Sequence, residues 1–105
     1  MSYRITFSNV AVEDIGKMSK EIYSACLDKK TAEEYVNNLL KKINEKADFP
    51  ESGVPLLFLK QSTGYRYIIY KSYLAFYRIE GNEMIVERIL FGKSNYFKDL
   101  LVEGD

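Results

Sequence analysis

Two adjacent residues, Gly81 and Asn82, constrain the fold of this chain more than any other feature. They lie between two runs of strand-forming residues, 73–79 and 84–91. Glycine and asparagine tolerate the positive φ angles that two-residue β-hairpin turns require, so the pair predicts a tight hairpin with a fixed register. The expected cross-strand pairs are Ile79 with Met84, Tyr77 with Val86, and Ala75 with Arg88.

A second short turn, at Lys71 and Ser72, links residues 65–70 to the same hairpin. Its expected pairs are Tyr70 with Tyr73, Ile68 with Ala75, and Arg66 with Tyr77. Because side chains alternate between the faces of a strand, this register divides the sheet into two faces. The face expected to pack on helices carries Tyr67, Ile69, Leu74, Phe76, Ile85, Ile89 and Phe91. The face expected to bind partners carries Arg66, Tyr70, Tyr73, Ala75, Tyr77 and Arg88, with the two arginines converging.

The N-terminal half predicts one strand and two helices. Alternating apolar residues indicate a strand over residues 3–7, and apolar spacings of three and four indicate a helix that ends near Leu27. Residues 31–34, Thr-Ala-Glu-Glu, have the form of a capping box that starts a second helix. The expected fold is therefore α+β, with a helical hairpin packed on an antiparallel sheet. A strand at 56–59, a loop at 61–64 and a short C-terminal helix at 94–101 complete it.

Length and composition indicate a single soluble domain over residues 1–105. The chain begins without a basic and apolar leader, and no window approaches the roughly 20 apolar residues of a membrane span. The lone cysteine, Cys26, has apolar neighbours and is expected in the core, which favours a reducing cytoplasm. The absence of histidine removes the usual general base and zinc ligand, so we expect neither a metal nor another cofactor.

Charge is balanced over the whole chain but biased toward the C-terminal half. Fifteen basic and fifteen acidic residues cancel, whereas residues 60–98 hold seven basic against three acidic residues, a net of +4. Any polyanion would therefore bind locally rather than through a global field. Arg66 and Arg88 beside Tyr70, Tyr73 and Tyr77 could hold phosphates and stack bases, or could form a protein interface, or could be surface charge. Arg78 falls near Glu87 and is assigned to a structural ion pair.

Four short segments in order resemble the RelE/ParE superfamily of bacterial toxins. They are residues 4–8 (Arg-Ile-Thr-Phe-Ser) with Ala11 and Asp14, the connector 49–53 (Phe-Pro-Glu-Ser-Gly), the strands 64–67 and 76–79, and the ending 88–93 with Tyr96. The resemblance covers essentially the whole chain. It implies a growth-inhibiting toxin of a type II toxin-antitoxin module, neutralised by a cognate antitoxin protein that masks its working surface. A homodimer is kept as an alternative assembly.

Two mechanisms are implied by the resemblance. RelE-like members cut mRNA on the ribosome, and in that case Arg66, Arg88 and Tyr96 would be the catalytic residues. However, the lysine-rich strand of those members is here 56–60, Leu-Leu-Phe-Leu-Lys. The ending Gly92-Lys93-Ser94-Asn95-Tyr96 looks more like the ParE branch, whose members poison DNA gyrase. The resemblance therefore favours gyrase as the target, with Lys93 added to the partner-binding residues, and keeps the ribosome as the alternative.

Overall fold

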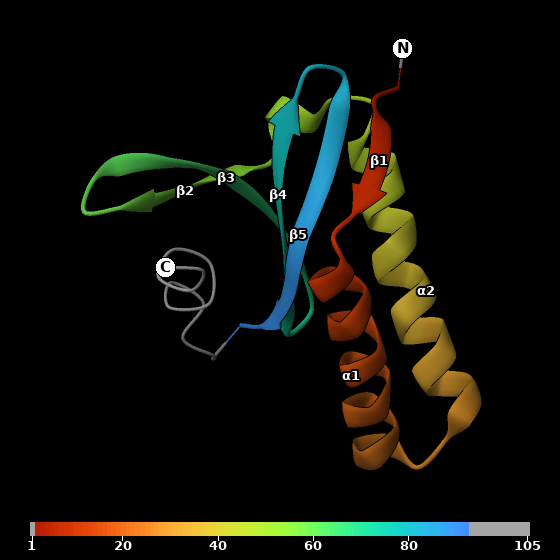
Figure 1. Cartoon of the computed structure of the whole chain (residues 1–105). Helices are drawn as coiled ribbons and strands as arrows, with labels where there is room; N and C mark the ends of the chain where they lie inside the picture. The colour runs from red at the N-terminus through yellow and green to blue at the C-terminus, as the bar shows by residue number, and fades with distance from the viewer. Residues whose placement is uncertain (1, 93–105) are drawn as a thin grey trace.

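The structure is a computed structural model that describes residues 2–92, and Figure 1 shows its helices lying beside a twisted sheet. The expected helix at 94–101 lies outside the described residues. Five strands, two helices and one short 3-10 helix occur in the described part. In chain order they are β1 (Arg4–Phe7), α1 (Asn9–Cys26), α2 (Lys29–Lys46), the 3-10 helix (Pro50–Ser52), β2 (Val54–Phe58), β3 (Gln61–Tyr70), β4 (Tyr73–Glu80) and β5 (Glu83–Phe91).

Side-chain caps define where the two helices start. The Ser8 hydroxyl accepts a hydrogen bond from the Ala11 amide at 2.9 Å, and α1 ends where Leu27 adopts a left-handed φ of 57°. The second helix begins earlier than expected, because Asp28 rather than Thr31 is its N-cap. The Asp28 carboxylate accepts from the Lys30 amide at 3.1 Å and from the Thr31 hydroxyl at 2.7 Å. Thr31 therefore supports the cap instead of forming it.

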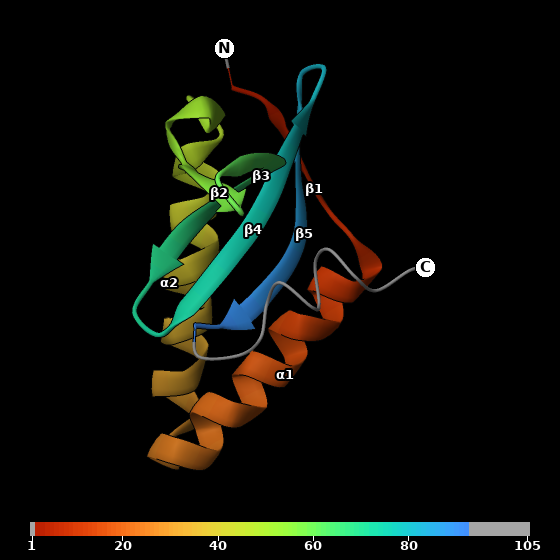
Figure 2. The ribbon, with the colours of Figure 1, turned by 90° about the vertical axis from the view of Figure 1, so that its left-hand side faces the viewer.

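The sheet is mixed, with strand order β1-β5-β4-β3-β2. The strand β1 joins β5 in parallel, while β2, β3, β4 and β5 are antiparallel neighbours. Figure 2 shows the two helices on one face of this sheet. The expected α+β fold is confirmed, and the parallel edge strand adds to it.

The two predicted turns set most of the register correctly. All three expected pairs between β3 and β4 are present, as are Ile79 with Met84 and Tyr77 with Val86. The pairing of Ala75 with Arg88 is wrong. The ladder shifts between Phe76 and Tyr77, so that Ala75 pairs with Ile89 and Phe76 with Arg88. Glu87 is the extra residue, and such a β-bulge redirects the side chains that follow it.

The assignment of the two sheet faces is also wrong, although Ile89 is buried in the main core as expected. Ala75 and Tyr77 are fully buried and Tyr73 is 4% exposed, within the main core between sheet and helices. By contrast Ile69 and Phe91, expected in the core, are 51% and 42% exposed. The Tyr73 and Tyr77 hydroxyls donate hydrogen bonds to Glu21 and to the Pro50 carbonyl, which makes this burial favourable. The main core consists of Ala11, Met18, Val36, Leu39, Ile43, Ala47, Ile68, Tyr73, Ala75, Tyr77, Met84, Val86 and Ile89. A smaller cluster holds Leu56, Phe76 and Leu90, packed by Tyr65, Tyr67 and Leu74.

Two further local expectations need correction. Cys26 is exposed rather than buried, because it is the last residue of α1 and the buried residues of that helix end at Met18. Residues 61–64 belong to β3 instead of forming a loop, so β2 and β3 make one hairpin that extends away from the helices (Figure 1). Within the described residues, no helix is both long and apolar enough to cross a membrane.

Candidate functional site

Arg88 is held by a carboxylate from the first helix. Its Nε donates to Oδ2 of Asp14 at 2.8 Å and its Nη2 to Oδ1 at 3.2 Å. The same Oδ2 accepts the backbone amide of Ile89 at 3.0 Å. The two side chains are only 15% and 9% exposed, so this bidentate pair connects α1 firmly to β5 at the bulge.

Beside this pair lies a hollow of about 260 Å³ between α1 and the end of β5. Its lining is charged and includes Asp14, Lys17, Glu21, Tyr73 and Arg88. The Tyr73 hydroxyl donates to Oε1 of Glu21 at 2.7 Å. Burial, followed by this hydrogen bond to a carboxylate, raises the pKa of Tyr73. The phenol is therefore a neutral hydrogen-bond donor here, and its proton is unsuited to general acid or base catalysis near neutral pH.

An aromatic hollow of about 480 Å³ adjoins the charged one, and the two share Glu21, Tyr73 and Phe91. The ring of Tyr35 packs edge-on against Tyr70 and Tyr73, with centroids 5.2 and 6.1 Å apart. The Lys71 ammonium lies 5.2 Å from the Tyr35 centroid, a cation–π distance. We call the two hollows together the α1 groove. It offers cations and carboxylates at one end and aromatic rings at the other.

Arg66 and Tyr77 are engaged elsewhere, by the connector that leads into β2. Arg66 donates through Nη1 to the Gly53 carbonyl at 3.1 Å, and the Tyr77 hydroxyl donates to the Pro50 carbonyl. Burial raises the pKa of Tyr77, while the Arg66 charge acts in the opposite direction. These two side chains fix the position of the 3-10 helix and the start of β2.

The predicted site residues thus fall into separate groups. Arg88 and Tyr73 meet in the α1 groove, whereas Arg66 and Tyr77 hold the connector, so the two arginines do not converge as expected. Tyr70 is partly buried against Tyr35. Arg78 is confirmed as a structural residue, because its Nε donates to Glu87 at 2.6 Å. Lys93 and Tyr96 lie outside the described residues.

The sequence interpretation missed three residues that shape the α1 groove, namely Asp14, Glu21 and Tyr35. Asp14 carried a usable signal. It lies three residues after Ala11 and four before Met18, on the apolar stripe of α1, where a carboxylate requires a buried partner. Glu21 sits at an ordinary exposed position and Tyr35 on the apolar face of the second helix, and only the packed helices bring them to Tyr73.

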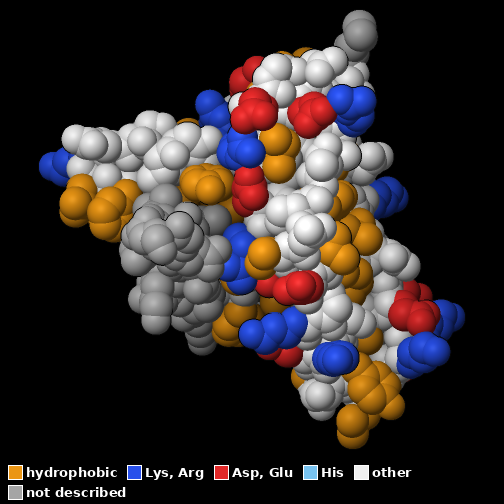
Figure 3. Space-filling view, viewed as in Figure 1, with side chains coloured by type: hydrophobic (Ala, Val, Ile, Leu, Met, Phe, Trp, Pro, Cys, Tyr) orange, Lys and Arg blue, Asp and Glu red, His pale blue; other side chains and the backbone are white. Residues whose placement is uncertain are grey.

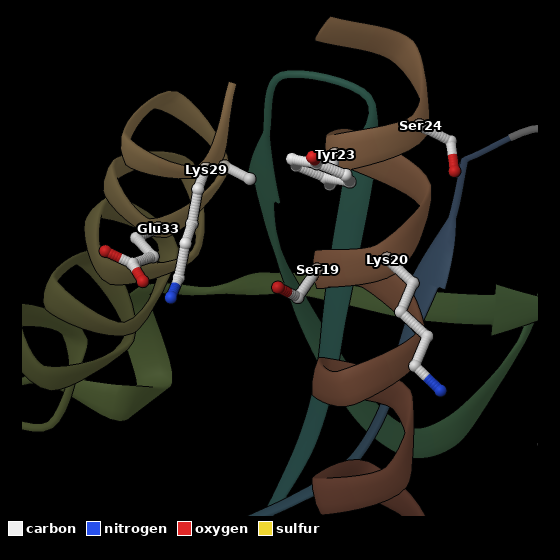
Figure 4. Close-up of a pocket in the computed structure, with 7 residues that line it drawn as sticks. Ser19, Lys20, Tyr23, Ser24, Lys29 and Glu33 are labelled. Atoms are coloured by element: carbon white, nitrogen blue, oxygen red, sulfur yellow. The ribbon is translucent and has the colours of Figure 1, made fainter. Parts of the chain in front are cut away.

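A further hollow lies between the two helices near their connecting turn (Figure 4). It measures about 520 Å³ and is lined by Ser19, Lys20, Tyr23, Ser24, Lys29, Ala32 and Glu33. In Figure 4, Lys20 and Tyr23 extend from α1, and Lys29 and Glu33 from α2. Nothing in this lining forms a metal site, and residues 2–92 contain no group of three or more His, Cys, Asp or Glu placed to bind one.

Several solved structures share this fold, among them two from toxin-antitoxin systems. A chain from the chromosomal ParDE toxin-antitoxin system of P. aeruginosa superposes with a TM-score of 0.71 at 15% identity, covering 86% of this chain and 96% of that one. A chain of the RelBE2 toxin-antitoxin complex from Mycobacterium tuberculosis gives 0.56 at 19% identity, covering 87% and 99%. At these identities the likeness concerns the fold alone. A search of curated proteins finds no match.

The family assignment comes from the sequence. The model of the family described as ParE toxin of the type II toxin-antitoxin system parDE matches residues 5–96. This match spans every strand and helix described above, from within β1 to beyond the end of β5. The chain therefore belongs to the ParE toxin family, and it is the toxin of a type II toxin-antitoxin system.

Proposed function

We propose that this toxin inhibits DNA gyrase by binding it, without cutting RNA, and that a cognate antitoxin blocks it. The observation that carries the proposal is the engagement of both candidate arginines. Arg66 donates to the Gly53 carbonyl and Arg88 is bidentate to Asp14. A ribonuclease requires cations directed at a scissile phosphate and a group that can accept a proton. In residues 2–92 these arginines instead stabilise the fold.

The tyrosines support the same proposal. Tyr77 is fully buried, and Tyr73 is held neutral by its surroundings. Neither ring can stack on an RNA base without unpacking the core between sheet and helices. The balanced charge of the whole chain also suits a protein target better than a polyanion.

The α1 groove is the surface that we assign to the antitoxin. It combines an apolar aromatic wall with the cations Lys17 and Lys71 nearby, while the charge of Arg88 is paired with Asp14. A short segment with aromatic or aliphatic residues next to carboxylates would complement both ends. Both similar structures come from toxin-antitoxin systems, which supports a proteinaceous antitoxin for this chain. We further propose a cytoplasmic location, where the exposed thiol of Cys26 would remain reduced.

Two assays on the same preparation test the mechanism. The full chain is purified with its antitoxin, separated under denaturing conditions and refolded. It is then added to gyrase with relaxed plasmid and ATP, and in parallel to ribosomes programmed with a defined mRNA. We expect loss of supercoiling and intact mRNA. Cleavage of the mRNA, with normal supercoiling, would establish the RelE-like ribosome-dependent endoribonuclease instead.

A further inference from the structure

The hairpin formed by β2 and β3 ends in an exposed apolar tip. Leu59 is 81% exposed and Leu57 is 54% exposed, and Lys60 completes the turn. We call these three residues the hairpin tip. Figure 1 shows the hairpin reaching away from the helices, and Figure 3 shows hydrophobic and basic side chains at its projecting end. Large apolar side chains in so exposed a position lose contact with the protein core, so folding does not explain them.

The backbone of the tip gives a second, independent indication of function. Leu59 and Lys60 have φ angles of 53° and 66°, in the left-handed region that residues with a Cβ rarely adopt. Such a conformation costs roughly 1 kcal/mol for each residue with a Cβ. The β4–β5 turn meets the same need with Gly81, at a φ of 61°. Leu27 shares this conformation at the end of α1, so the feature that sets the tip apart is the grouping of two such residues with exposed Leu57 on a projecting hairpin.

The chemistry of the tip identifies the kind of partner. Residues 54–59, Val-Pro-Leu-Leu-Phe-Leu, carry no charge, and the only charged residue of the tip is Lys60. A polyanion such as RNA would find little to bind here. An apolar cleft with acidic residues at its rim would accept the leucines and pair with the lysine.

The size and position of the tip favour a larger protein over a second copy of this chain. A stable homodimer buries about 800 Å² from each partner, which is more than the tip offers together with its exposed neighbours Val54 and Phe58 on the narrow strand β2. A narrow projection fits into a cleft instead. The strand β2 is an edge strand, separated by β3 and β4 from β5, which lines the α1 groove. The tip is therefore a different surface from the groove that we assign to the antitoxin.

We propose that the hairpin tip docks into an apolar, acid-rimmed cleft of the toxin's target protein. This inference rests on the proposed function, in which that target is DNA gyrase, and it adds the contact surface. Because the α1 groove is a different surface, an antitoxin bound there would block this contact by obstructing a large target protein rather than by covering the tip.

The test compares one substitution at two matched leucines. Leu27 is also exposed, at 76%, and also has a positive φ, of 57°, but lies at the end of α1. Asparagine tolerates this conformation, so Leu59→Asn and Leu27→Asn should both keep the fold and a similar Tm. We expect Leu59→Asn to raise the concentration for half-inhibition of gyrase supercoiling at least tenfold. Leu27→Asn should leave it within twofold, and Lys60→Glu should raise it several-fold.

Each other result has a defined meaning. If folded Leu59→Asn inhibits gyrase like the wild-type chain, the tip is not the docking surface. The inference is equally overturned if Leu59→Asn weakens only the binding of the antitoxin. It is also overturned if the wild-type chain sediments as a dimer and the only effect of Leu59→Asn is to convert that dimer into monomers. If the wild-type chain does not inhibit gyrase, the proposed target is wrong. The role of the tip is then decided by the growth of cells that express the wild-type chain or each variant without the antitoxin. If Leu59→Asn loses toxicity and Leu27→Asn does not, the tip is the docking surface for another target protein. If Leu59→Asn stays as toxic as the wild-type chain, the tip is not a docking surface.

Discussion

Gly53 lies directly against the hydroxyl of Tyr77, so close that a Cβ at position 53 would overlap the phenol oxygen. That hydroxyl is anchored on the Pro50 carbonyl, and Arg66 donates to the Gly53 carbonyl itself. Because the Tyr77 ring is fully buried, it cannot move aside without disturbing the core. The glycine of the connector is therefore required by packing rather than by its backbone angles.

Gly53→Ala should consequently destabilise the fold by about 2 kcal/mol, the usual scale for overpacking a core. Urea denaturation followed by circular dichroism would measure this loss. Gly16→Ala is the matched control, since a Cβ there meets nothing within 4 Å and sits inside α1. It should stabilise by about 0.5–1 kcal/mol. Equal effects at the two glycines would contradict the packing explanation.

The ion pair between Asp14 and Arg88 leads to a second prediction. Asp14→Asn keeps the shape of the side chain but leaves the Arg88 guanidinium largely buried without its counter-charge. We expect a loss of about 3 kcal/mol in the free energy of unfolding, the lower end of the range for broken buried ion pairs. Glu80→Gln provides the comparison, because Glu80 bonds Arg78 at the surface and is 67% exposed. That change should cost below about 1 kcal/mol. A small effect at Asp14 would show that the pair contributes little to stability.

Tyr73 should make the protein sensitive to alkali. Its pKa is raised in the folded state by burial and by Glu21, so the folded protein favours the neutral phenol. This contribution is complete below the unfolded tyrosine pKa of about 10 and is lost as pH rises above it. Tyr73→Phe should therefore show a smaller fall in urea midpoint between about pH 9.5 and 11 than the wild-type chain. Identical pH profiles for the two proteins would exclude Tyr73 as the source.

The turns and the helical spacing made much of the fold predictable. Gly81-Asn82 and Lys71-Ser72 placed five of six cross-strand pairs correctly. The sixth failed because the bulge at Glu87 has no local sequence signal, since its residue type is ordinary on a strand. The position of Asp14 beneath Arg88 follows from this bulge and from α1 packing on β5.

The two faces of the sheet were harder to distinguish, for a physical reason. Along β4, both alternating sets of side chains are apolar or aromatic at residues 73–77, Tyr-Leu-Ala-Phe-Tyr. Alternation alone therefore cannot select the face that the helices cover. The selection depends on distant partners, namely Glu21 for Tyr73 and the Pro50 carbonyl for Tyr77. The candidate site was misplaced because tyrosine was read as an exposed residue when its hydroxyl has a buried acceptor.

The assignment of the α1 groove to the antitoxin gives a last prediction. Lys17 lines the charged end of the groove and is exposed, so Lys17→Glu should preserve the fold while repelling an acidic segment. Affinity for the antitoxin encoded beside the toxin, measured by surface plasmon resonance, should fall about tenfold, mainly through slower association. Lys41→Glu makes the same charge change on the exposed surface of α2, away from the groove. It should alter affinity less than about twofold, because screening weakens distant charges. If the two reversals weaken binding equally, the net charge of the toxin rather than the α1 groove governs the complex.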